Sequence, residues 1–358
     1  MKLLYITNGI NGSGGLERVL SIKASYFAEK LGYEVIILCL NEAHSDPFYQ
    51  FSEKIRMVSI PVGGNPFQYI CAYKNGIQKT VNDIQPDIIS VCDDGLKAFF
   101  IPYFLKTDAK LIYERHVSKL IEWKDHFSLM KKIGIKVKWF LMEILAKKFS
   151  YFVVLTEGNT KEWTSLKNLK VIPNPLSFFP EKSSTLENKV VICVGKISYQ
   201  KGQDLLVKAW EKVHELYPDW ELHLYGKEDL SILDTHHLSH NIHYFPPAKD
   251  IEQKYLESSI YVMSSRFEGF GMVLTEAMAC GVPCVSFDCD FGPSDIIQHQ
   301  IDGLIIDKEN IHDLTDQLIK LISNYDLRKV LGSNAKINVQ KFAIEPIAKQ
   351  WENLFKLF

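Results

Sequence analysis

The stretch that decides the fold reads RFEGFGMVLTEAMACGVP and covers residues 266–283. An apolar, strand-like run at 258–263 precedes it, and 272–280 has helical spacing, so a strand, a loop and a helix follow in that order. Glycines at 269 and 271 let the backbone approach a ligand closely, and the N–H groups of 270–273 open the helix at its positive dipole end. A helix start of this kind attracts anions.

Two carboxylates in this stretch are candidates for ligand binding. Glu268 precedes the expected helix, and Glu276 follows eight residues later. Eight helical residues span about 12 Å, so the two carboxylates suit two parts of a long ligand better than one small contact. Taken alone, the pair also fits a loop charge and a solvated helix residue, but the glycines and the strand-to-helix context favour a binding site.

The composition is that of a globular protein with no overall attraction for polyanions. The 358 residues are 46% hydrophobic and 23% charged, with a formal net charge of −2, so no global field favours nucleic acid. The length predicts two domains. Seven cysteines at scattered positions are expected to be reduced core residues of a cytosolic protein. The apolar run at 3–7 lacks a cleavage site and indicates a first strand, not a signal peptide.

Apolar runs of strand length alternate with amphipathic segments, which predicts parallel sheets wrapped by helices. We expect strands at 3–7, 35–40, 57–60, 87–92, 111–113, 152–155 and 171–173, with helices at 16–31 and 67–83. The pattern then restarts, with strands at 189–195, 221–225, 242–245, 260–263, 284–287 and 303–306 and a helix at about 202–216. The prolines of 173–177 make a hinge between the halves.

The expected fold class is therefore α/β, with two Rossmann-like, doubly wound domains that face a central cleft. The first domain covers 1–173 and the second 174–342. Apolar residues at helical spacing in 343–358 predict a helix that needs a surface to cover, and we expect it to cross back onto the first domain.

The segment 119–149 does not fit this alternation, because lysines and aromatic residues are interleaved in it. The lysines are Lys131, Lys132, Lys136, Lys138, Lys147 and Lys148, and the aromatic residues are Trp123, Phe127, Trp139, Phe140 and Phe149. A basic, aromatic amphipathic helix can lie in a membrane interface, but its charges prevent it from spanning a bilayer. An ordinary surface helix with solvated lysines explains the pattern equally well.

Two glycine-containing loops are candidates for anion binding. A glycine-rich turn that includes Gly14 and Gly15 follows the first strand, and a loop with Lys196 and Lys201 follows the first strand of the second domain. A dinucleotide fingerprint would need a third glycine where Glu17 stands, and no G-x-x-x-x-G-K-[ST] motif occurs. A nicotinamide-dependent dehydrogenase is thus the least favoured class, although a ligand-free turn and surface lysines remain alternatives for the two loops.

Taken together, these segments resemble the retaining family-4 glycosyltransferases of the GT-B fold over nearly the whole chain. The family shows a glycine-rich first loop, a G-R-x-x-x-x-K-G loop and an E-x7-E element, and matching segments occur here in the same order. The resemblance implies that Lys196 and Lys201 bind a diphosphate, that Glu276 binds ribose hydroxyls and that Glu268 binds donor-sugar hydroxyls. It further implies contacts to the sugar and phosphate from the N–H groups of Phe270, Gly271, Met272 and Val273, and a uracil near Pro246, Pro247 and Ala248.

The resemblance has one departure and one loosely aligned residue. Lys196 stands where the family usually has arginine, so the charge is kept and the bidentate fork is lost. His116 follows the strand at 111–113, where many relatives place a histidine near the reacting centre. A contact to the sugar or acceptor and a purely structural role are equally compatible with this position.

The resemblance implies catalysis by neutralising the charge on the leaving diphosphate, with Glu268, His116 and Lys201 as catalytic residues. Same-face attack by the acceptor, without a protein nucleophile, is the description favoured for the family. No cofactor and no metal are expected, because lysines replace the divalent cation. A metal site is a minor alternative, in His236, His237, His240 and His243 or in Cys280, Cys284 and Cys289.

The implied substrate is a UDP-sugar that donates a hexose or N-acetylhexosamine to a glycan. The run at 290–297, followed by 302–304, looks like that of bacterial transferases that build surface or lipid-linked glycans. With segment 119–149, this implies a polyprenyl-diphosphate-linked acceptor and a cytoplasmic protein that is peripheral on the inner membrane, in capsule or lipopolysaccharide synthesis. A GT-B epimerase or synthase and a catalytically silent nucleotide-sugar-binding scaffold are the alternatives.

Overall fold

The computed structural model describes residues 1–42, 46–123, 127–234, 238 and 240–358. They form two units, one of Met1–Pro175 with Ile344–Phe358 and one of Leu176–Ala343. The sequence places the corresponding boundaries at 173/174 and 342/343. No helix of the described residues has both the length and the apolar character needed to cross a membrane.

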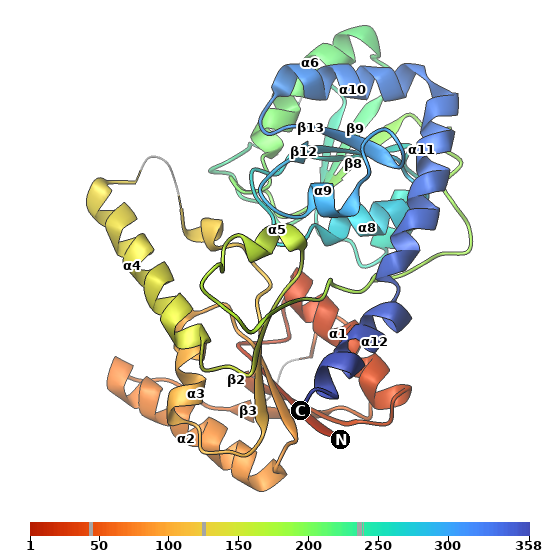
Figure 1. Ribbon diagram of the computed structural model, residues 1–358. Coiled ribbons are helices and arrows are strands. Elements are labelled where there is room, and N and C mark those ends of the chain that lie inside the picture. The colour runs from red at the N-terminus through yellow and green to blue at the C-terminus, as the bar shows by residue number, and fades with distance from the viewer. Residues whose placement is uncertain (43–45, 124–126, 235–237, 239) are drawn as a thin grey trace. The chain divides into compact units, whose positions relative to one another are not determined.

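The first unit is built on a sheet of seven parallel strands in the order β3-β2-β1-β4-β5-β6-β7 (Figure 1). Its strands are β1 (Lys2–Thr7), β2 (Glu34–Leu40), β3 (Arg56–Ile60), β4 (Ile88–Cys92), β5 (Lys110–Glu114), β6 (Tyr151–Val154) and β7 (Leu169–Val171). Its helices are α1 (Gly15–Glu29), α2 (Pro66–Ile84), α3 (Ile101–Phe104), α4 (Leu129–Ala146), α5 (Glu157–Thr160) and α12 (Ile344–Phe355), with 3-10 turns η1 (Leu96–Phe100) and η2 (Lys119–Glu122).

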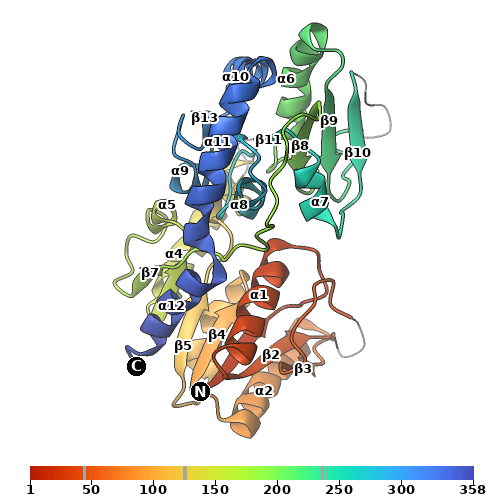
Figure 2. The same ribbon diagram turned by 90° about the vertical axis from the view of Figure 1, so that its right-hand side faces the viewer.

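Both faces of this sheet are buried, which explains why its strands are apolar almost throughout. Leu4 and Ile6 of β1 point into a core shared with α2 and α4, whereas Leu3 and Tyr5 point into a core shared with α1 and α12. Figures 1 and 2 both show α12 beside α1, on the second of these faces. The helix at the carboxyl end of the chain therefore completes the core of the first unit.

The second unit is built on a sheet of six parallel strands in the order β10-β9-β8-β11-β12-β13. These strands are β8 (Val190–Val194), β9 (Glu221–Tyr225), β10 (Ile242–Phe245), β11 (Ile260–Met263), β12 (Cys284–Asp288) and β13 (Gly303–Asp307). The helices are α6 (Gln203–Leu216), α7 (Ile251–Leu256), α8 (Met272–Ala279), α9 (Pro293–Ile296), α10 (Ile311–Ser323) and α11 (Tyr325–Asn338), with the 3-10 turn η3 (Val339–Phe342).

Each sheet has a point at which the strand order reverses. Numbered within its own unit, each sheet begins 3-2-1-4-5-6, the doubly wound order of the Rossmann fold. The reversal lies between β1 and β4 in the first unit and between β8 and β11 in the second. In such folds ligands bind beyond the carboxyl ends of the strands at this point. The predicted α/β class is confirmed, and each unit has one expected binding edge.

Two of the expected elements differ from the structure. The strand expected at 171–173 is Leu169–Val171, because Pro173 lacks an N–H and disfavours a continued ladder. The segment 119–149 is not one helix, since it contains the short turn η2 and then α4, and residues 124–126 lie outside the described residues. Lys119 of η2 is buried, and its Nζ donates to Glu143 at 2.7 Å.

Helix α11 packs closely against the residues that follow α8, and this packing predicts how glycine substitutions change stability. A Cβ atom on Gly332 of α11 would lie 2.2 Å from the carbonyl oxygen of Gly281, whereas one on Gly134 of α4 would meet nothing within 4 Å. We expect Gly332→Ala to lower the free energy of unfolding by about 1–3 kcal/mol through overpacking. Gly134→Ala should raise it by about 0.5–1 kcal/mol, because glycine is the poorer helix former. Differential scanning calorimetry of both variants provides the check, and an unchanged melting temperature for Gly332→Ala would contradict the packing described.

Candidate functional site

In the second unit, two loops meet at the point where the strand order reverses. The loop 195–202 follows β8 and carries the two lysines, and the loop 264–271 follows the neighbouring strand β11 and carries Glu268. Lys201 Nζ donates to Glu268 Oε1 at 2.6 Å, and Ser265 Oγ donates to the same oxygen at 2.6 Å. The structure therefore brings together two predicted site residues that are 67 positions apart in the sequence.

Arg266 fastens these two loops to each other. Its guanidinium group donates to both carboxylate oxygens of Asp204, at 2.9 and 2.8 Å, and its Nε donates to Glu309 Oε1 at 2.7 Å. Its Nη1 also donates to the carbonyl oxygen of Tyr199 at 2.7 Å, and Tyr199 belongs to the loop 195–202. The hydrogen bonds to Asp204 raise the pKa of Arg266 above its usual value. A bidentate Arg–carboxylate pair fixes orientation as well as distance, so the position of Lys201 depends on this arginine.

The helix α8 begins four residues after Glu268, and the N–H groups of its first turn are not used within the helix. Gly271 is the N-cap with φ +98°, a backbone conformation that residues with a Cβ rarely adopt. Met272 and Val273 form the first turn, whose N–H groups have no partner within the helix. The expectation that Phe270 also opens the helix is wrong, because Phe270 precedes the N-cap and its buried ring packs edge-on against Phe342.

Glu276 is separated from Glu268 and has its own partners. Its Oε1 accepts a hydrogen bond from Ser177 Oγ at 2.7 Å, and its Oε2 accepts one from Tyr255 at 3.3 Å. Both Glu268 and Glu276 are buried, which excludes the alternative of a loop charge and a solvated helix residue. Buried carboxylates require partners, and here those partners are side chains of the same unit.

Two further predicted positions lie on the surface of this unit. Lys196 is exposed, and its carbonyl oxygen accepts a hydrogen bond from the Gln203 side chain at 3.2 Å. Pro246, Pro247 and Ala248, the expected neighbours of a uracil, directly follow the carboxyl end of β10. Both roles remain predictions.

In the first unit, the glycine-rich turn is occupied by a side chain of this chain itself. Gly14 is the N-cap of α1, and Gly15 is its first residue. The carboxylate of Glu17 folds back over the turn, so a Cβ on Gly12 would lie 2.4 Å from Glu17 Oε1. Burial raises the pKa of Glu17. The helix dipole favours an acidic group at the start of a helix. The sequence predicts a phosphate-binding turn here, and in the structure the carboxylate of Glu17 lies in this turn.

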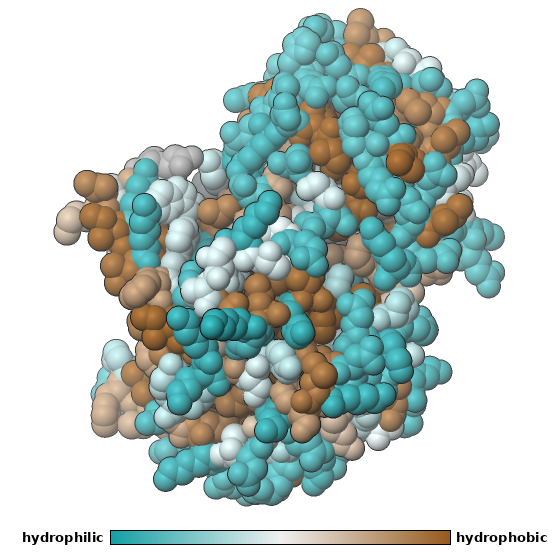
Figure 3. Space-filling model, viewed as in Figure 1, coloured by the Kyte–Doolittle hydropathy of each residue, from teal (hydrophilic) through white to brown (hydrophobic). Residues whose placement is uncertain are grey.

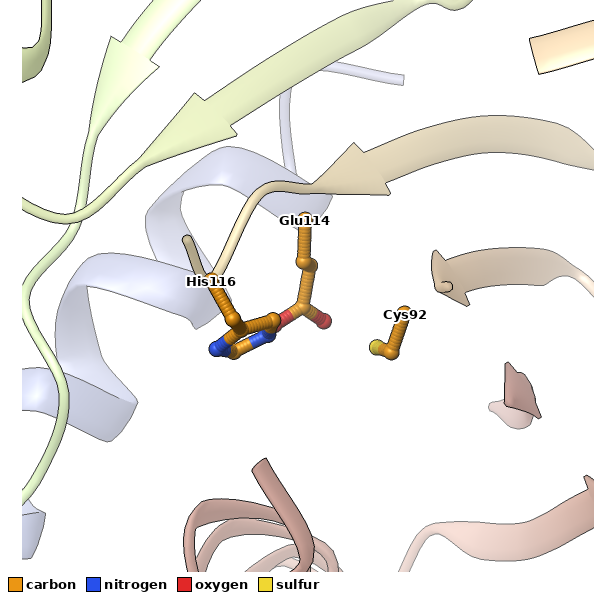
Figure 4. Close-up of side chains that lie close together, drawn as sticks. All are labelled: Cys92, Glu114 and His116. Atoms are coloured by element: carbon orange, nitrogen blue, oxygen red, sulfur yellow. The ribbon is translucent and has the colours of Figure 1, made fainter. Parts of the chain in front are cut away.

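His116 lies two residues after Glu114, the buried last residue of β5 (Figure 4). Its imidazole is 5% exposed, and its Nε2 lies 3.4 Å from Glu114 Oε2 without hydrogen-bond alignment. Glu114 is 2% exposed and accepts hydrogen bonds from Lys23 Nζ and from Ser90 Oγ. Burial opposes ionisation of Glu114, but the charge of Lys23 and the neighbouring His116 outweigh it and lower its pKa to about 2.

Cys92, Glu114 and His116 have the residue types of a metal site, with their ligand atoms within 4.8 Å of one another (Figure 4). The contacts argue against a cation there. The carboxylate of Glu114 already accepts from the ammonium of Lys23, which would repel a metal ion. Burial also raises the pKa of the Cys92 thiol well above its usual value, which disfavours the thiolate that a metal requires.

The two minor metal alternatives of the sequence do not form such a group among the described residues. His236 and His237 lie outside those residues. All seven cysteines are unpaired, as predicted, and burial raises the pKa of Cys280 to about 12. Cys280 and Cys284 direct their thiols at the carbonyl oxygens of Glu252 and Leu274, so they are core residues.

Sequence reasoning missed Lys23, Glu114 and the Arg266–Asp204 pair. Lys23 lies on an amphipathic helix, where a lysine usually indicates the solvated face, and here it is 1% exposed. A usable signal was the position of Glu114 at the end of an apolar strand, where an ionisable residue is expected to have a partner.

Comparisons with known proteins show the family to which the chain belongs and the proteins that share its fold. The family described as "Glycosyl transferases group 1" matches residues 177–338. The amylovoran biosynthesis glycosyltransferase AmsD of Erwinia amylovora is 30% identical over 375 residues, covering 99% of both chains. The lipopolysaccharide 1,6-galactosyltransferase of Salmonella typhimurium is 22% identical over 348 residues, covering 90% of both chains. The crystal structure of HepE from Anabaena in complex with UDP-glucose has a similar fold, with a TM-score of 0.78 and 18% identity over the whole of both chains.

The role of Arg266 leads to a test of the loop geometry. Arg266→Lys keeps the charge but loses the bidentate fork, so the loop with Lys201 should be less well fixed. We expect affinity for UDP, the nucleotide that the motifs imply, to fall about 10-fold, measured by isothermal titration calorimetry.

Arg328→Lys is the matched control. Arg328 is buried in the same unit and donates to the carbonyl oxygens of Leu321, Ile322 and Leu186, none of which belongs to the two loops. This variant should lower the melting temperature and leave UDP affinity within twofold. Equal losses of affinity in both variants would assign the effect to general destabilisation.

Proposed function

Because the chain belongs to the group 1 glycosyltransferases and has the GT-B fold, we propose that it transfers a hexose or N-acetylhexosamine from a UDP-sugar to a glycan. The observation that carries the proposal is the Lys201–Glu268 ion pair in the loops that meet near the start of α8, with Glu268 buried and Lys201 partly exposed. This arrangement combines a cation and unpaired N–H groups for a diphosphate with a carboxylate for sugar hydroxyls. HepE, which was crystallised with UDP-glucose, supports a UDP-linked donor.

In the proposed reaction the bond between the anomeric carbon and the diphosphate oxygen breaks, and a bond to the acceptor oxygen forms on the same face. The acceptor proton passes to the leaving diphosphate, so configuration is retained without a protein nucleophile. Lys196, Lys201 and the first turn of α8 neutralise the charge that grows on the diphosphate. Glu268 orients the sugar, Glu276 holds the ribose, and no metal or other cofactor takes part.

The first unit is proposed to bind the acceptor and to present His116 to the reacting groups. Gly14 and Gly15 at the start of α1 are proposed to contact the donor, and the Glu17 carboxylate that occupies this turn offers a hydrogen-bond acceptor for hydroxyl groups. The relatives from Erwinia and Salmonella act, by name, in amylovoran and lipopolysaccharide synthesis. They support a role in bacterial surface-glycan assembly. That the acceptor is carried on a polyprenyl diphosphate is a further part of the proposal.

A surface of α4 supports a location at the inner face of the membrane. Leu129, Met130, Ile133, Val137, Phe140 and Ile144 form a stripe of exposed apolar side chains at helical spacing. Brown atoms gather over α4 at the left edge of Figure 3. Exposed lysines lie among and beyond them, at 131, 136, 147 and 148. Apolar side chains flanked by lysines fit an anionic lipid surface, so we propose that α4 holds this cytoplasmic protein on the membrane as a peripheral protein.

Donor binding is the first prediction of the proposal. In the presence of a chelator, one member of a panel of UDP- and GDP-sugars should raise the melting temperature of the parent by mass action. Lys201→Ala and Glu276→Ala should abolish this shift, because each removes a charge that the donor needs. Differential scanning fluorimetry measures the effect.

Lys189→Ala is the matched control for donor binding. It removes an exposed ion pair with Asp219 that lies at the opposite, amino-terminal edge of the same sheet, and the donor should stabilise this variant as it does the parent. If no nucleotide-sugar stabilises the parent, the proposal fails. UDP release that depends on a glycan acceptor distinguishes a transferase from a silent scaffold, and from an epimerase or synthase of the same fold.

Membrane binding is the second prediction. The double variant Val137→Ser/Phe140→Ser should bind vesicles of phosphatidylglycerol and phosphatidylcholine about 10-fold more weakly than the parent, because two apolar side chains are lost from the contact. Flotation of vesicles on a density gradient measures the bound fraction.

Val330→Ser/Ile337→Ser removes two apolar side chains of similar exposure from α11 and should not change vesicle binding. Vesicles of phosphatidylcholine alone should bind the parent less than the anionic vesicles do, since the lysines then lose their partners. Binding that is equal in both double variants would show that α4 is an ordinary surface helix.

A further inference from the structure

We propose that Glu114 is a positioning residue for His116, and that Lys23 and the C-terminal helix α12 hold Glu114 in place. The proposal rests on the proposed function, in which His116 faces the reacting groups. It concerns side chains of the first unit alone.

The carboxylate of Glu114 lies at the centre of a buried cluster from four elements. Lys23 comes from α1, Ser90 and Cys92 from β4, Glu114 from β5, and His116 from the loop that follows β5. Lys23 and Ser90 donate to the two oxygens of Glu114, and one of these oxygens also faces His116 Nε2 at 3.4 Å. His116 Nε2 is buried and has no hydrogen-bond partner among the described residues.

Stability alone does not account for this ion pair. Removing two charges from water costs several kcal/mol for each ion, and replacing a buried pair by apolar residues is often neutral or stabilising. Lys23 is 1% exposed and Glu114 is 2% exposed, so both bear this cost. What the pair provides is an ionised carboxylate at a fixed position directly beside an imidazole nitrogen.

The C-terminal helix closes this cluster. Lys23 Nζ lies 4.2 Å from the ring centroid of Trp351 on α12 and 5.2 Å from that of Tyr5 on β1. A cation between aromatic faces is stabilised electrostatically and is shielded from water. Trp351 therefore keeps Lys23 directed at Glu114, and Glu114 in turn limits the orientations of His116.

Other charged groups near His116 do not replace Glu114. The backbone N–H of His116 donates to Asp94 Oδ1 at 3.3 Å, and this contact holds the main chain but not the ring. Glu17, on the N-terminal turn of α1, interacts with His116 electrostatically, but no hydrogen bond joins the two among the described contacts. Glu114 is thus the carboxylate that directly faces the ring.

The test compares Glu114→Gln, His116→Gln and the double variant in the full-length protein. Glu114→Gln should lower kcat about 10- to 100-fold, the range expected for misplacement of a reacting group, and leave the Kd for UDP-sugar within twofold. If Glu114 acts through His116, the double variant should be no slower than His116→Gln within about threefold. Losses that multiply in the double variant would give Glu114 a separate role and overturn the proposal.

A second readout does not depend on activity. The ring 15N chemical shifts of His116, assigned with His116→Gln, report which nitrogen carries the proton, and they should change in Glu114→Gln. Glu143→Gln is the matched control, because Glu143 also accepts from one lysine and one serine in the same unit. Unchanged His116 shifts in Glu114→Gln would refute the positioning role.

Glu114→Asp serves if Glu114→Gln does not fold, since it keeps the charge beside Lys23 and withdraws the carboxylate from the ring. It should change the His116 shifts in the same way, and unchanged shifts would again overturn the proposal. If the parent itself transfers no sugar, the proposed function fails, while the chemical shifts still decide whether Glu114 positions His116.

Discussion

The parallel direction of all strands within each sheet is the constraint on which the rest of the molecule depends. Because every strand of a sheet ends at the same edge, residues that follow different strands meet there without any local signal in the sequence. Lys201 and Glu268 meet in this way in the second unit. In the first unit, the pairing of Val91 with Tyr113 carries Cys92 and Glu114 to neighbouring positions. A shift of this register by one residue would turn Glu114 to the opposite face.

Each of the two edges has a buried charged group whose pairing makes its burial possible. Glu114 is matched by Lys23, and Arg266 by Asp204 and Glu309. Removing one partner of a buried pair typically lowers the free energy of unfolding by about 3–5 kcal/mol, because the remaining charge is buried without a partner or water. Each pair joins segments from different elements, so the geometry of the two edges and the stability of their units are coupled. The side chains at these edges are consequently held in place without a ligand.

Most of the fold follows from patterns that are local in the sequence. Strands buried on both faces are nearly continuous apolar runs, and glycines and prolines mark where they stop. The strand expected at 171–173 was misplaced next to such a proline. The apolar run continues to Pro173, but the strand hydrogen bonds end at Val171. Phe270 was misplaced because the positive φ of Gly271, which sets the start of α8, is not visible in residue types alone.

The site was only partly predictable, for a different reason. Glu268, Glu276 and the lysine loop belong to short motifs, so the sequence indicates them directly. The partners that fix the site are remote: Lys23 and Glu114 are 91 positions apart, and Arg266 and Asp204 are 62 apart. Which lysine is buried, and which carboxylate faces it, depends on the packing of whole elements. Glu17 is a further example, because its turn back over the glycine loop depends on the conformation of that loop.

The position of α12 has a consequence for how the protein is made. The first unit contains a helix that the ribosome produces only after the whole of the second unit. Synthesis of that intervening segment takes on the order of 10 seconds. During this time Lys23 lacks the cover of Trp351, and the part of the apolar sheet face that α12 covers is open. When the ribosome has completed the second unit, the first unit of the nascent chain therefore still lacks one helix. Chaperone binding to the growing chain should concentrate on the surface that α12 later covers.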